Sequence, residues 1–221
     1  MKLTIFNGSP RGSRGNTQKL LDRFIMGFMS ITAEETDKNS FEVHNIKDIK
    51  SAEEAMNLFS NAECVMFAFP LYVYAMPSGV MRFIEYLEPL CGKDGNPDMC
   101  FLVQGGFPEA IHSRSLEKYL DKLTHRLNSR NLGTIIKGGC EGLEVKPKFV
   151  TIPIFDGIRK IGKHFGENGT LDKDLLMDYS KPERMGTGPI SRMKAKFFVF
   201  MANRLFWKKK LEKNKALPKH G

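Results

Sequence analysis

A segment of ten residues near the N-terminus, 8–17, combines three glycines, three hydroxyl side chains and two arginines in the order GSPRGSRGNT. Glycine lets a backbone bend closely around a bound group, because it carries no Cβ. Hydroxyl, amide and guanidinium groups donate hydrogen bonds to anions. The side chains of this segment that can do so are Ser9, Arg11, Ser13, Arg14, Asn16 and Thr17. The composition favours a phosphate as the bound group.

Two predicted elements position this segment. The apolar residues 3–6 predict a short strand before it, and apolar residues at helical spacing predict a helix after it, which ends near Ile31. In a turn from strand to helix, the unpaired N–H groups and the positive end of the helix dipole face a bound anion. An ordinary polar turn capped by Asn16 or Thr17 is the alternative that local composition leaves open.

Several other classes of site are excluded by spacing. The segment has neither the Gly-Lys-Ser/Thr of a Walker A loop nor the Gly-x-Gly-x-x-Gly of a dinucleotide turn, which disfavours nucleotide triphosphatases and the usual dehydrogenases. No cysteine has an arginine six residues later, so a phosphatase of the Cys-x5-Arg kind is excluded. The cysteines form no Cys-x-x-Cys pair and have no histidine at ligand spacing, which predicts no iron–sulfur cluster, no metal site and no disulfide. They are Cys64, Cys91, Cys100 and Cys140.

Signals for strand and helix alternate along the next hundred residues. Further strands are predicted over 41–46, 64–69, 99–103 and 133–136, and the runs at 64–69 and 99–103 are apolar throughout, as in strands buried on both faces. A helix with Ser78 as its N-cap is expected to turn Met81, Ile84 and Leu87 towards the core. The alternation predicts a five-stranded parallel sheet covered by helices on both faces. We expect such a sheet to have the flavodoxin-like, three-layer α/β/α arrangement with the strand order 2-1-3-4-5. A helix stopped by Gly166 and a shorter one over 172–179 complete a single domain of residues 1–190.

In such a sheet the ligand lies at the carboxyl ends of the strands, where the strand order reverses. The loops there follow the first, third and fourth strands. The second of these loops, residues 70–77, is apolar and aromatic where a solvent-facing loop should be polar, so it is expected to lie against a flat ring. The third, Gln104-Gly105-Gly106, leaves its backbone amides free to approach the polar edge of a ring. A phosphate, a flat ring and a polar ring edge together describe flavin mononucleotide (FMN).

Simpler interpretations of the second and third loops stay open at this point. Tyr72 and Tyr74 could pack on a neighbouring helix or on a second subunit. Gly105 and Gly106 could form no more than a tight turn. The agreement of three loops at one edge of the sheet favours the cofactor site over these separate explanations.

The three motifs, taken in order, resemble the NADPH-dependent FMN reductase family of flavin and quinone reductases. They are Gly8-Ser9-Pro10-Arg11 with Gly15-Asn16-Thr17, then Phe69-Pro70-Leu71-Tyr72 through Met76-Pro77, then Gly105-Gly106, and they cover residues 1–140. The resemblance implies that the phosphate is held by Ser9, Arg11, Ser13, Asn16 and Thr17. It implies that the isoalloxazine is flanked by Pro70, Leu71, Tyr72 and Val73, and that its pyrimidine end is met by Gln104, Gly105 and Gly106.

The resemblance further implies an enzyme in which bound FMN passes hydride from NADPH or NADH to a quinone, a flavin or a similar small acceptor. No catalytic side chain is required. His112 could offer a proton to a quinone-like acceptor, although a surface position at the start of a helix is favoured. The alternative function is a flavodoxin-like electron carrier or redox sensor without NAD(P)H turnover.

The net charge of +9 comes from the C-terminal segment 191–221, which holds ten Lys and Arg residues against one acid, so that residues 1–190 are neutral overall. Residues 193–207 are rich in Phe, Met and Leu and are followed by three lysines. This predicts a basic amphipathic helix, and packing on the body or across a dimer interface is favoured over contact with a membrane surface. Nucleic-acid binding is not expected. A homodimer is expected from the family resemblance, and a cytoplasmic location from the absence of an apolar span or signal sequence.

Overall fold

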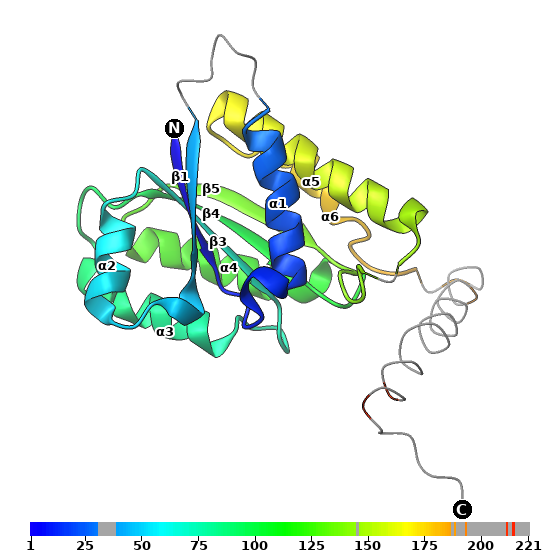
Figure 1. The fold of residues 1–221 in the computed structure, drawn as a ribbon, viewed down its shortest axis with the longest axis horizontal. Helices are drawn as coiled ribbons and strands as arrows, with labels where there is room; N and C mark the ends of the chain where they lie inside the picture. Colours follow the sequence, from blue (N-terminus) through cyan, green and yellow to red (C-terminus); the bar gives the residue numbers. More distant parts are fainter. Residues whose placement is uncertain are drawn as a thin grey trace, which may run out of the picture.

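A computed structural model describes residues 1–30, 39–144 and 146–186, and the single residues 188, 193, 211 and 214. The predicted C-terminal helix therefore lies almost wholly outside the described residues. One five-stranded parallel sheet organises the chain, in the order β2-β1-β3-β4-β5 (Figure 1). The strands are β1 (Lys2–Asn7), β2 (Ser40–Asn45), β3 (Cys64–Pro70), β4 (Asp98–Gln104) and β5 (Asn131–Lys137). The predicted strand order is confirmed.

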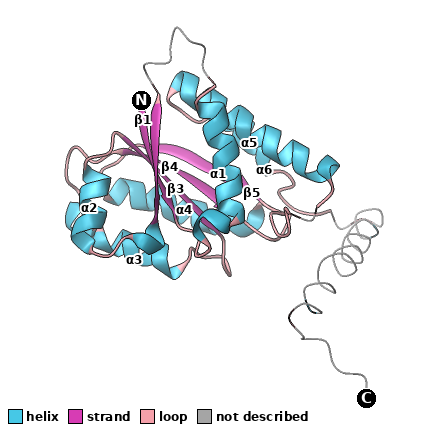
Figure 2. Cartoon of the chain, viewed as in Figure 1, coloured by secondary structure: helices cyan, strands magenta, loops and turns pink. Residues whose placement is uncertain are grey.

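Helices cover both faces of the sheet, which confirms the predicted three layers (Figure 2). Along β1, Leu3 and Ile5 belong to one apolar core, and Phe6 belongs to the other, because successive side chains of a strand point to opposite faces. The helices over the first core are α1 (Asn16–Phe28), α5 (Lys148–Asn168) and α6 (Lys173–Ser180). Those over the second are α2 (Ala52–Ser60), α3 (Ser78–Tyr86) and α4 (Ile111–Arg126).

The two central strands have no exposed face. Every residue of β3 is buried, and so is every residue of β4 after Asp98. Cys64 and Cys100 lie in these strands as buried core residues, as the apolar runs predicted. Burial raises the pKa of the Cys100 thiol well above its usual value, so this thiol stays protonated.

Three element boundaries and one buried helix face differ from the sequence predictions. Helix α1 ends at Phe28, before Ile31, which lies outside the described residues. Helix α5 continues past Gly166 and ends where Gly169 takes a left-handed conformation with φ +66°. Helix α3 has Pro77, not Ser78, at its N-cap. The buried residues of α3 and of the turn after it are Val80, Phe83 and Leu87, whereas Met81 and Ile84 line a surface groove.

Helices α1 and α5 cross in direct backbone contact. A Cβ added to Gly162 would lie 2.1 Å from the carbonyl oxygen of Phe24, and a Cβ added to Gly27 would lie 2.0 Å from that of Arg159. Real Cβ atoms do not approach backbone atoms so closely. The two glycines therefore set the distance between these helices.

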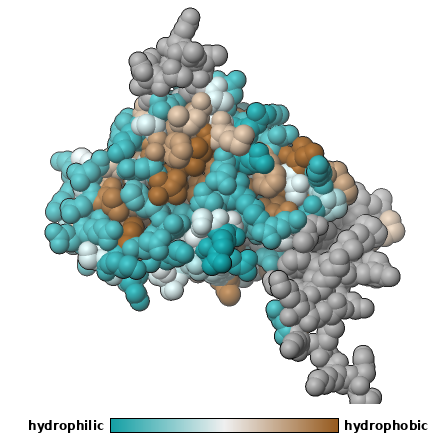
Figure 3. Space-filling view, viewed as in Figure 1, coloured by the Kyte–Doolittle hydropathy of each residue, from teal (hydrophilic) through white to brown (hydrophobic). Residues whose placement is uncertain are grey.

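The surface between β2 and α1 carries an apolar patch on the side of the molecule that Figure 3 displays. β2 is an edge strand, and Phe41 on it is 42% exposed. Met26 on α1 is 53% exposed. Within the described residues, no helix is long and apolar enough to cross a membrane.

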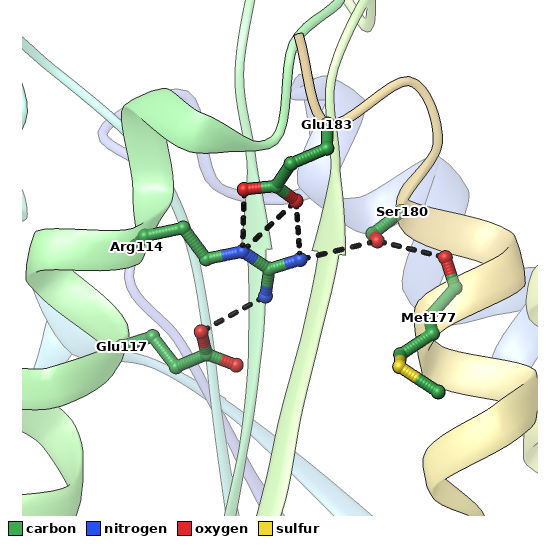
Figure 4. Close-up of polar contacts among 5 residues, drawn as sticks. All are labelled: Arg114, Glu117, Met177, Ser180 and Glu183. Carbon is green, nitrogen blue, oxygen red and sulfur yellow. Dashed lines mark hydrogen bonds and ion pairs between the residues drawn. The ribbon is translucent and has the colours of Figure 1, made fainter.

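Residues 180–183, which include the end of α6, form hydrogen bonds with residues at the start of α4 (Figure 4). The carbonyls of Pro182 and Glu183 accept hydrogen bonds from the amides of Ala110 and Ile111, at 3.0 and 3.1 Å. The Arg114 guanidinium donates to the Glu183 carboxylate from Nε at 3.2 Å and from Nη2 at 2.7 Å. Further bonds join Arg114 to Glu117 and Ser180. Residues 180–183 thus cap the helix that follows the third predicted loop.

The variant Glu183→Gln is expected to lower the free energy of unfolding by about 1 kcal/mol at pH 7, because it weakens a partly exposed, charge-assisted hydrogen bond. Hydrogen bonding from Arg114 lowers the pKa of Glu183 below its usual 4.5. A carboxyl with a lowered folded-state pKa stabilises the fold above pH 4.5, and this stabilisation is lost as the pH falls through the lowered value. Urea unfolding at pH 7 and pH 3 should show the difference between wild type and variant shrinking at the lower pH. A difference that is equal at both values would contradict this role.

Candidate active site

The first predicted loop is held in a fixed shape between β1 and α1. The buried side chain of Asn7 accepts a hydrogen bond from the amide of Ser9 at 3.0 Å and donates one to Gln18 at 2.9 Å. Gly8 lies so close to α3 that an added Cβ would be 2.2 Å from Val80 Cγ2. The sequence analysis did not single out Asn7, although it ends the first strand, where loop-shaping residues are expected.

The N-terminus of α1 opens into this loop without a side-chain cap. Its N-cap is Gly15, which makes no side-chain hydrogen bond to the first turn. The first amides of a helix have no acceptor within the helix, and together with the dipole they attract an anion. Gly15 also packs closely against Ser9, since an added Cβ would lie 2.5 Å from Ser9 Oγ.

A small cavity of about 110 Å³ lies where the three predicted loops meet. Eight of the twelve predicted site residues line it: Ser9, Arg11, Asn16, Pro70, Leu71, Tyr72, Gln104 and Gly106. Gly15 and Glu141 complete the lining. Whole small-molecule sites measure roughly 300–1,000 Å³, so this cavity matches one end of a ligand such as FMN, whose rings would extend over the open surface beside it.

The other four predicted site residues lie nearby but outside this lining. Ser13 is exposed in the short helical turn after Arg11. Thr17 is fully buried, and its hydroxyl accepts a hydrogen bond of 3.4 Å from the Gln104 amide. Val73 is 93% exposed at the tip of a turn. The amide of Gly105 donates to the carbonyl of Lys137 at 2.9 Å, so among the third-loop glycines Gly106 is the better donor to a ligand.

Asn16 has a structural partner across the site. Its side-chain amide donates to the carbonyl oxygen of Cys140 at 2.6 Å, which ties the first loop to the loop after β5. Burial raises the pKa of the Cys140 thiol to about 12, so the thiol remains protonated and is no nucleophile at neutral pH. Glu141, next to it, brings an acidic group to the cavity that the sequence analysis missed. Glu141 lies in the loop after the fifth strand, four residues beyond Lys137.

The second loop forms a tight hairpin turn with an unusual backbone. Tyr72 and Ala75 exchange two hydrogen bonds of 2.8 and 2.9 Å between their backbones. Val73 and Tyr74 between them have φ values of +48° and +63°. Residues other than glycine rarely adopt this conformation, and bulky or β-branched side chains least of all. Such strain is concentrated at functional sites, where it fixes side chains in place. Here it holds Tyr72 and Tyr74 at the surface.

The third loop contacts both the second loop and the loop after β5. The amide of Gly139 donates to the carbonyl of Phe107 at 2.8 Å. Phe107 itself is 71% exposed beside the site, and the sequence analysis did not select it. His112 links the loops, because its Nδ1 lies 3.1 Å from the Tyr74 hydroxyl and its Nε2 lies 3.2 Å from Glu109 Oε2. The favoured prediction, a position in the first turn of a helix, is correct, and His112 is also a cross-link between two site loops.

The three loops could therefore hold an elongated ligand with an anionic end and a flat apolar end. Serine, arginine and helix amides surround the anionic end, and Pro70, Leu71 and Tyr72 flank the apolar end. These groups fit FMN, because hydroxyl and guanidinium donors line the same cavity as apolar and aromatic side chains. Groups of three His, Cys, Asp or Glu side chains able to hold a metal ion are absent from the described parts of the chain.

Comparison with known proteins shows likeness at the level of structure. No protein-family model matches the sequence, and no curated protein matches it either. An azoreductase from Bacillus anthracis str. Sterne superposes with a TM-score of 0.57 at 15% identity, over 75% of this chain and 100% of that one. The chain has the flavodoxin-like fold.

Two further solved structures share this fold. One is an FMN-dependent NADH-azoreductase from Bacillus anthracis str. Ames Ancestor in complex with FMN, with a TM-score of 0.57 and 13% identity over 75% of this chain and 100% of that one. The other is an NAD(P)H:quinone oxidoreductase from Methanothermobacter marburgensis, with a TM-score of 0.56 and 13% identity over 75% of this chain and 96% of that one. These neighbours share the fold that the resemblance implies.

Proposed function

We propose that this protein is an FMN-dependent oxidoreductase that transfers hydride from NADPH or NADH, through bound FMN, to a small acceptor such as a quinone or a free flavin. The observation that carries the proposal is the cavity that joins the uncapped N-terminus of α1 to the apolar hairpin and the glycine loop. The FMN complex of a structural neighbour with the same fold supports the choice of cofactor.

In this proposal the first loop binds the phosphate. Ser9 and Ser13 donate hydroxyl hydrogen bonds, Arg11 supplies positive charge, and the first amides of α1 complete the anion site. Asn16 fixes the first loop by donating a hydrogen bond to the Cys140 carbonyl, and the Thr17 hydroxyl fixes the Gln104 side chain by accepting a hydrogen bond from its amide. These two residues position the site.

The remaining loops hold and orient the ring. Pro70, Leu71, Tyr72 and Val73 provide an apolar surface, and the Gly106 amide donates to the polar edge, with Gln104 beside it. When bound, FMN supplies the hydride chemistry. An amide donor at the edge of the ring stabilises negative charge that develops there during reduction, as an oxyanion hole does. Gly105 acts through its bond to Lys137, which keeps the loop in place.

The proposal includes a homodimer. Tyr74 and Phe107 are 60% and 71% exposed beside the site, together with Tyr72 and Val73. A second copy seated over this rim would bury these side chains and shield the ring from water. The proposed location is the cytoplasm, because all four cysteines are free thiols, as in a reducing compartment.

The test is an anaerobic titration of the full chain, loaded with FMN, against NADH and NADPH. We expect one of the nucleotides to bleach the visible band of the bound flavin within seconds, and a quinone to restore it. Bound FMN that stays oxidised with both nucleotides would favour the alternative, an electron carrier or redox sensor. Failure to bind FMN would overturn both functions.

A further inference from the structure

The loop after β5 is bound to the first and third loops of the candidate site. The amide of Gly139 donates a hydrogen bond to the Phe107 carbonyl at 2.8 Å. The next amide, that of Cys140, donates to the Gly105 carbonyl at 2.8 Å. From the other side, the Asn16 side chain donates to the Cys140 carbonyl at 2.6 Å. The backbone is therefore fixed up to the residue that enters the cavity next.

That residue is Glu141, and its partly buried side chain lines the cavity of about 110 Å³. Among the described residues that line this cavity, it is the only acid. Its neighbour there is Gly106, because a Cβ built on Gly106 would lie 3.7 Å from Glu141 Cβ. Glu141 thus lies beside the residue whose amide is proposed to donate to the polar edge of the ring.

The charge of Glu141 fits the ring end of the cavity better than the phosphate end. A carboxylate that faced Ser9 and Arg11 would repel a phosphate bound between them. At the ring end a carboxylate has a favourable partner. The oxidised isoalloxazine carries a single N–H group, N3–H, which lies between two carbonyl groups. An amide donor matches a carbonyl group, and a carboxylate acceptor matches the N–H group.

The loop also supplies a positive charge near this carboxylate. The Lys146 ammonium donates to the Gly139 carbonyl, and it interacts electrostatically with Glu141. A carboxylate offers about four acceptor positions, so a hydrogen bond to a ligand is compatible with this interaction.

We propose that the Glu141 carboxylate accepts a hydrogen bond from N3–H of bound FMN, beside the Gly106 amide that donates to the adjoining carbonyl group. This assignment rests on the proposed function and adds a specificity-determining residue to it. Gly106 and Glu141 together select a ring whose edge presents an N–H group next to a carbonyl group. A ring without that N–H group would desolvate the carboxylate and give it no new partner, which costs affinity.

The test compares FMN, riboflavin and 3-methyl-FMN, in which a methyl group replaces the N3 hydrogen, by fluorescence titration with the apoprotein. We expect Glu141→Ala to raise the dissociation constant of FMN about tenfold, near the lower end for a hydrogen bond to a charged group. Riboflavin should lose the same factor, because the change acts on the ring. Wild type should bind 3-methyl-FMN about tenfold more weakly than FMN. The variant should bind FMN and 3-methyl-FMN equally.

The matched control is Glu144→Ala, in the same loop. The exposed Glu144 carboxylate accepts a hydrogen bond from Lys19 at 2.5 Å and does not line the cavity. This variant should bind all three flavins as wild type does. Urea unfolding followed by circular dichroism verifies that each variant is folded.

A second variant, Glu141→Gln, separates the hydrogen bond from the charge. The glutamine side chain keeps an oxygen acceptor, so this variant should lose less FMN affinity than Glu141→Ala. It should also raise the midpoint potential of bound FMN, because a negative charge beside the ring opposes reduction.

Equal affinity of wild type for FMN and 3-methyl-FMN would overturn the assignment, and so would the same discrimination in wild type and Glu141→Ala. Tighter binding of FMN by Glu141→Ala, with riboflavin unchanged, would place the carboxylate at the phosphate end and overturn it as well. In each of these cases wild type still binds FMN, so the proposed function stands. Failure of wild type to bind FMN would overturn both.

Discussion

Replacement of Gly162 by alanine is expected to lower the free energy of unfolding by about 3 kcal/mol, at the upper end of the usual effect of overpacking. The added methyl group would lie 2.1 Å from the carbonyl oxygen of Phe24 and 2.9 Å from the carbonyl carbon. These are backbone atoms of α1 and cannot rotate away, so the two helices must separate. Separation would loosen the core that Phe24, Phe28 and Phe165 form between them.

The matched control is Gly79→Ala, also within a helix. A Cβ there would have its nearest neighbour at 3.9 Å, in ordinary contact. Alanine is favoured over glycine in helices by up to about 1 kcal/mol, so this variant should be neutral or more stable than wild type. Urea unfolding of both variants gives the comparison. A Gly162→Ala protein as stable as Gly79→Ala would show that the two helices are not in backbone contact.

Replacement of Gly15 by alanine is expected to weaken FMN binding by about 30-fold, the equivalent of roughly 2 kcal/mol lost at a charge-assisted hydrogen-bond site. The added Cβ would lie 2.5 Å from Ser9 Oγ and 3.3 Å from the carbonyl oxygen of Gly12. The Ser9 side chain must then rotate away from the place proposed for the phosphate. Titration of FMN fluorescence with the apoprotein measures the dissociation constant.

Gly79→Ala serves again as the control and should bind FMN as wild type does. Riboflavin, which has the same ring without the phosphate, separates the two ends of the site. Because the Gly15 change acts on the phosphate, riboflavin affinity should be equal in wild type and variant. An equal loss for FMN and riboflavin would place the phosphate elsewhere.

Most of the fold could be predicted from local patterns. The runs at Cys64 and Met99 are apolar throughout, and alternation with helices leaves few topologies for such strands. The N-cap of α2 also follows a local pattern: Ser51-Ala-Glu-Glu54 has the spacing of a capping box, and Ser51 accepts a hydrogen bond from the Glu54 amide at 3.1 Å. The end of α5 was not. A glycine stops a helix only where its φ is positive, and sequence does not distinguish Gly166 from Gly169 in this respect.

One residue of the predicted inner face of α3, Met81, was wrong for a related reason, whereas Leu87 is buried and Ile84 is partly buried against the core. Periodicity shows that a helix has an apolar stripe, but two stripes overlap in this helix. Val80 and Phe83 contact the sheet, and Met81 and Ile84 line the groove. Only the position of α4 beside α3 decides which stripe is covered by the core.

The sequence by itself determined that the loops after β1, β3 and β4 meet at one edge of a parallel sheet. This was possible because glycine, proline and apolar runs set the conformation of the backbone close to them in the chain. It thereby selected eight residues of the cavity. The tertiary structure decided what each loop does with its hydrogen bonds. Asn16 bonds Cys140 and Gly105 bonds Lys137, and these partners are distant along the chain. It also brought Glu141 into the cavity and set α1 against α5 at Gly162. Such contacts depend on the packing of whole elements against one another, which no local pattern of residues encodes.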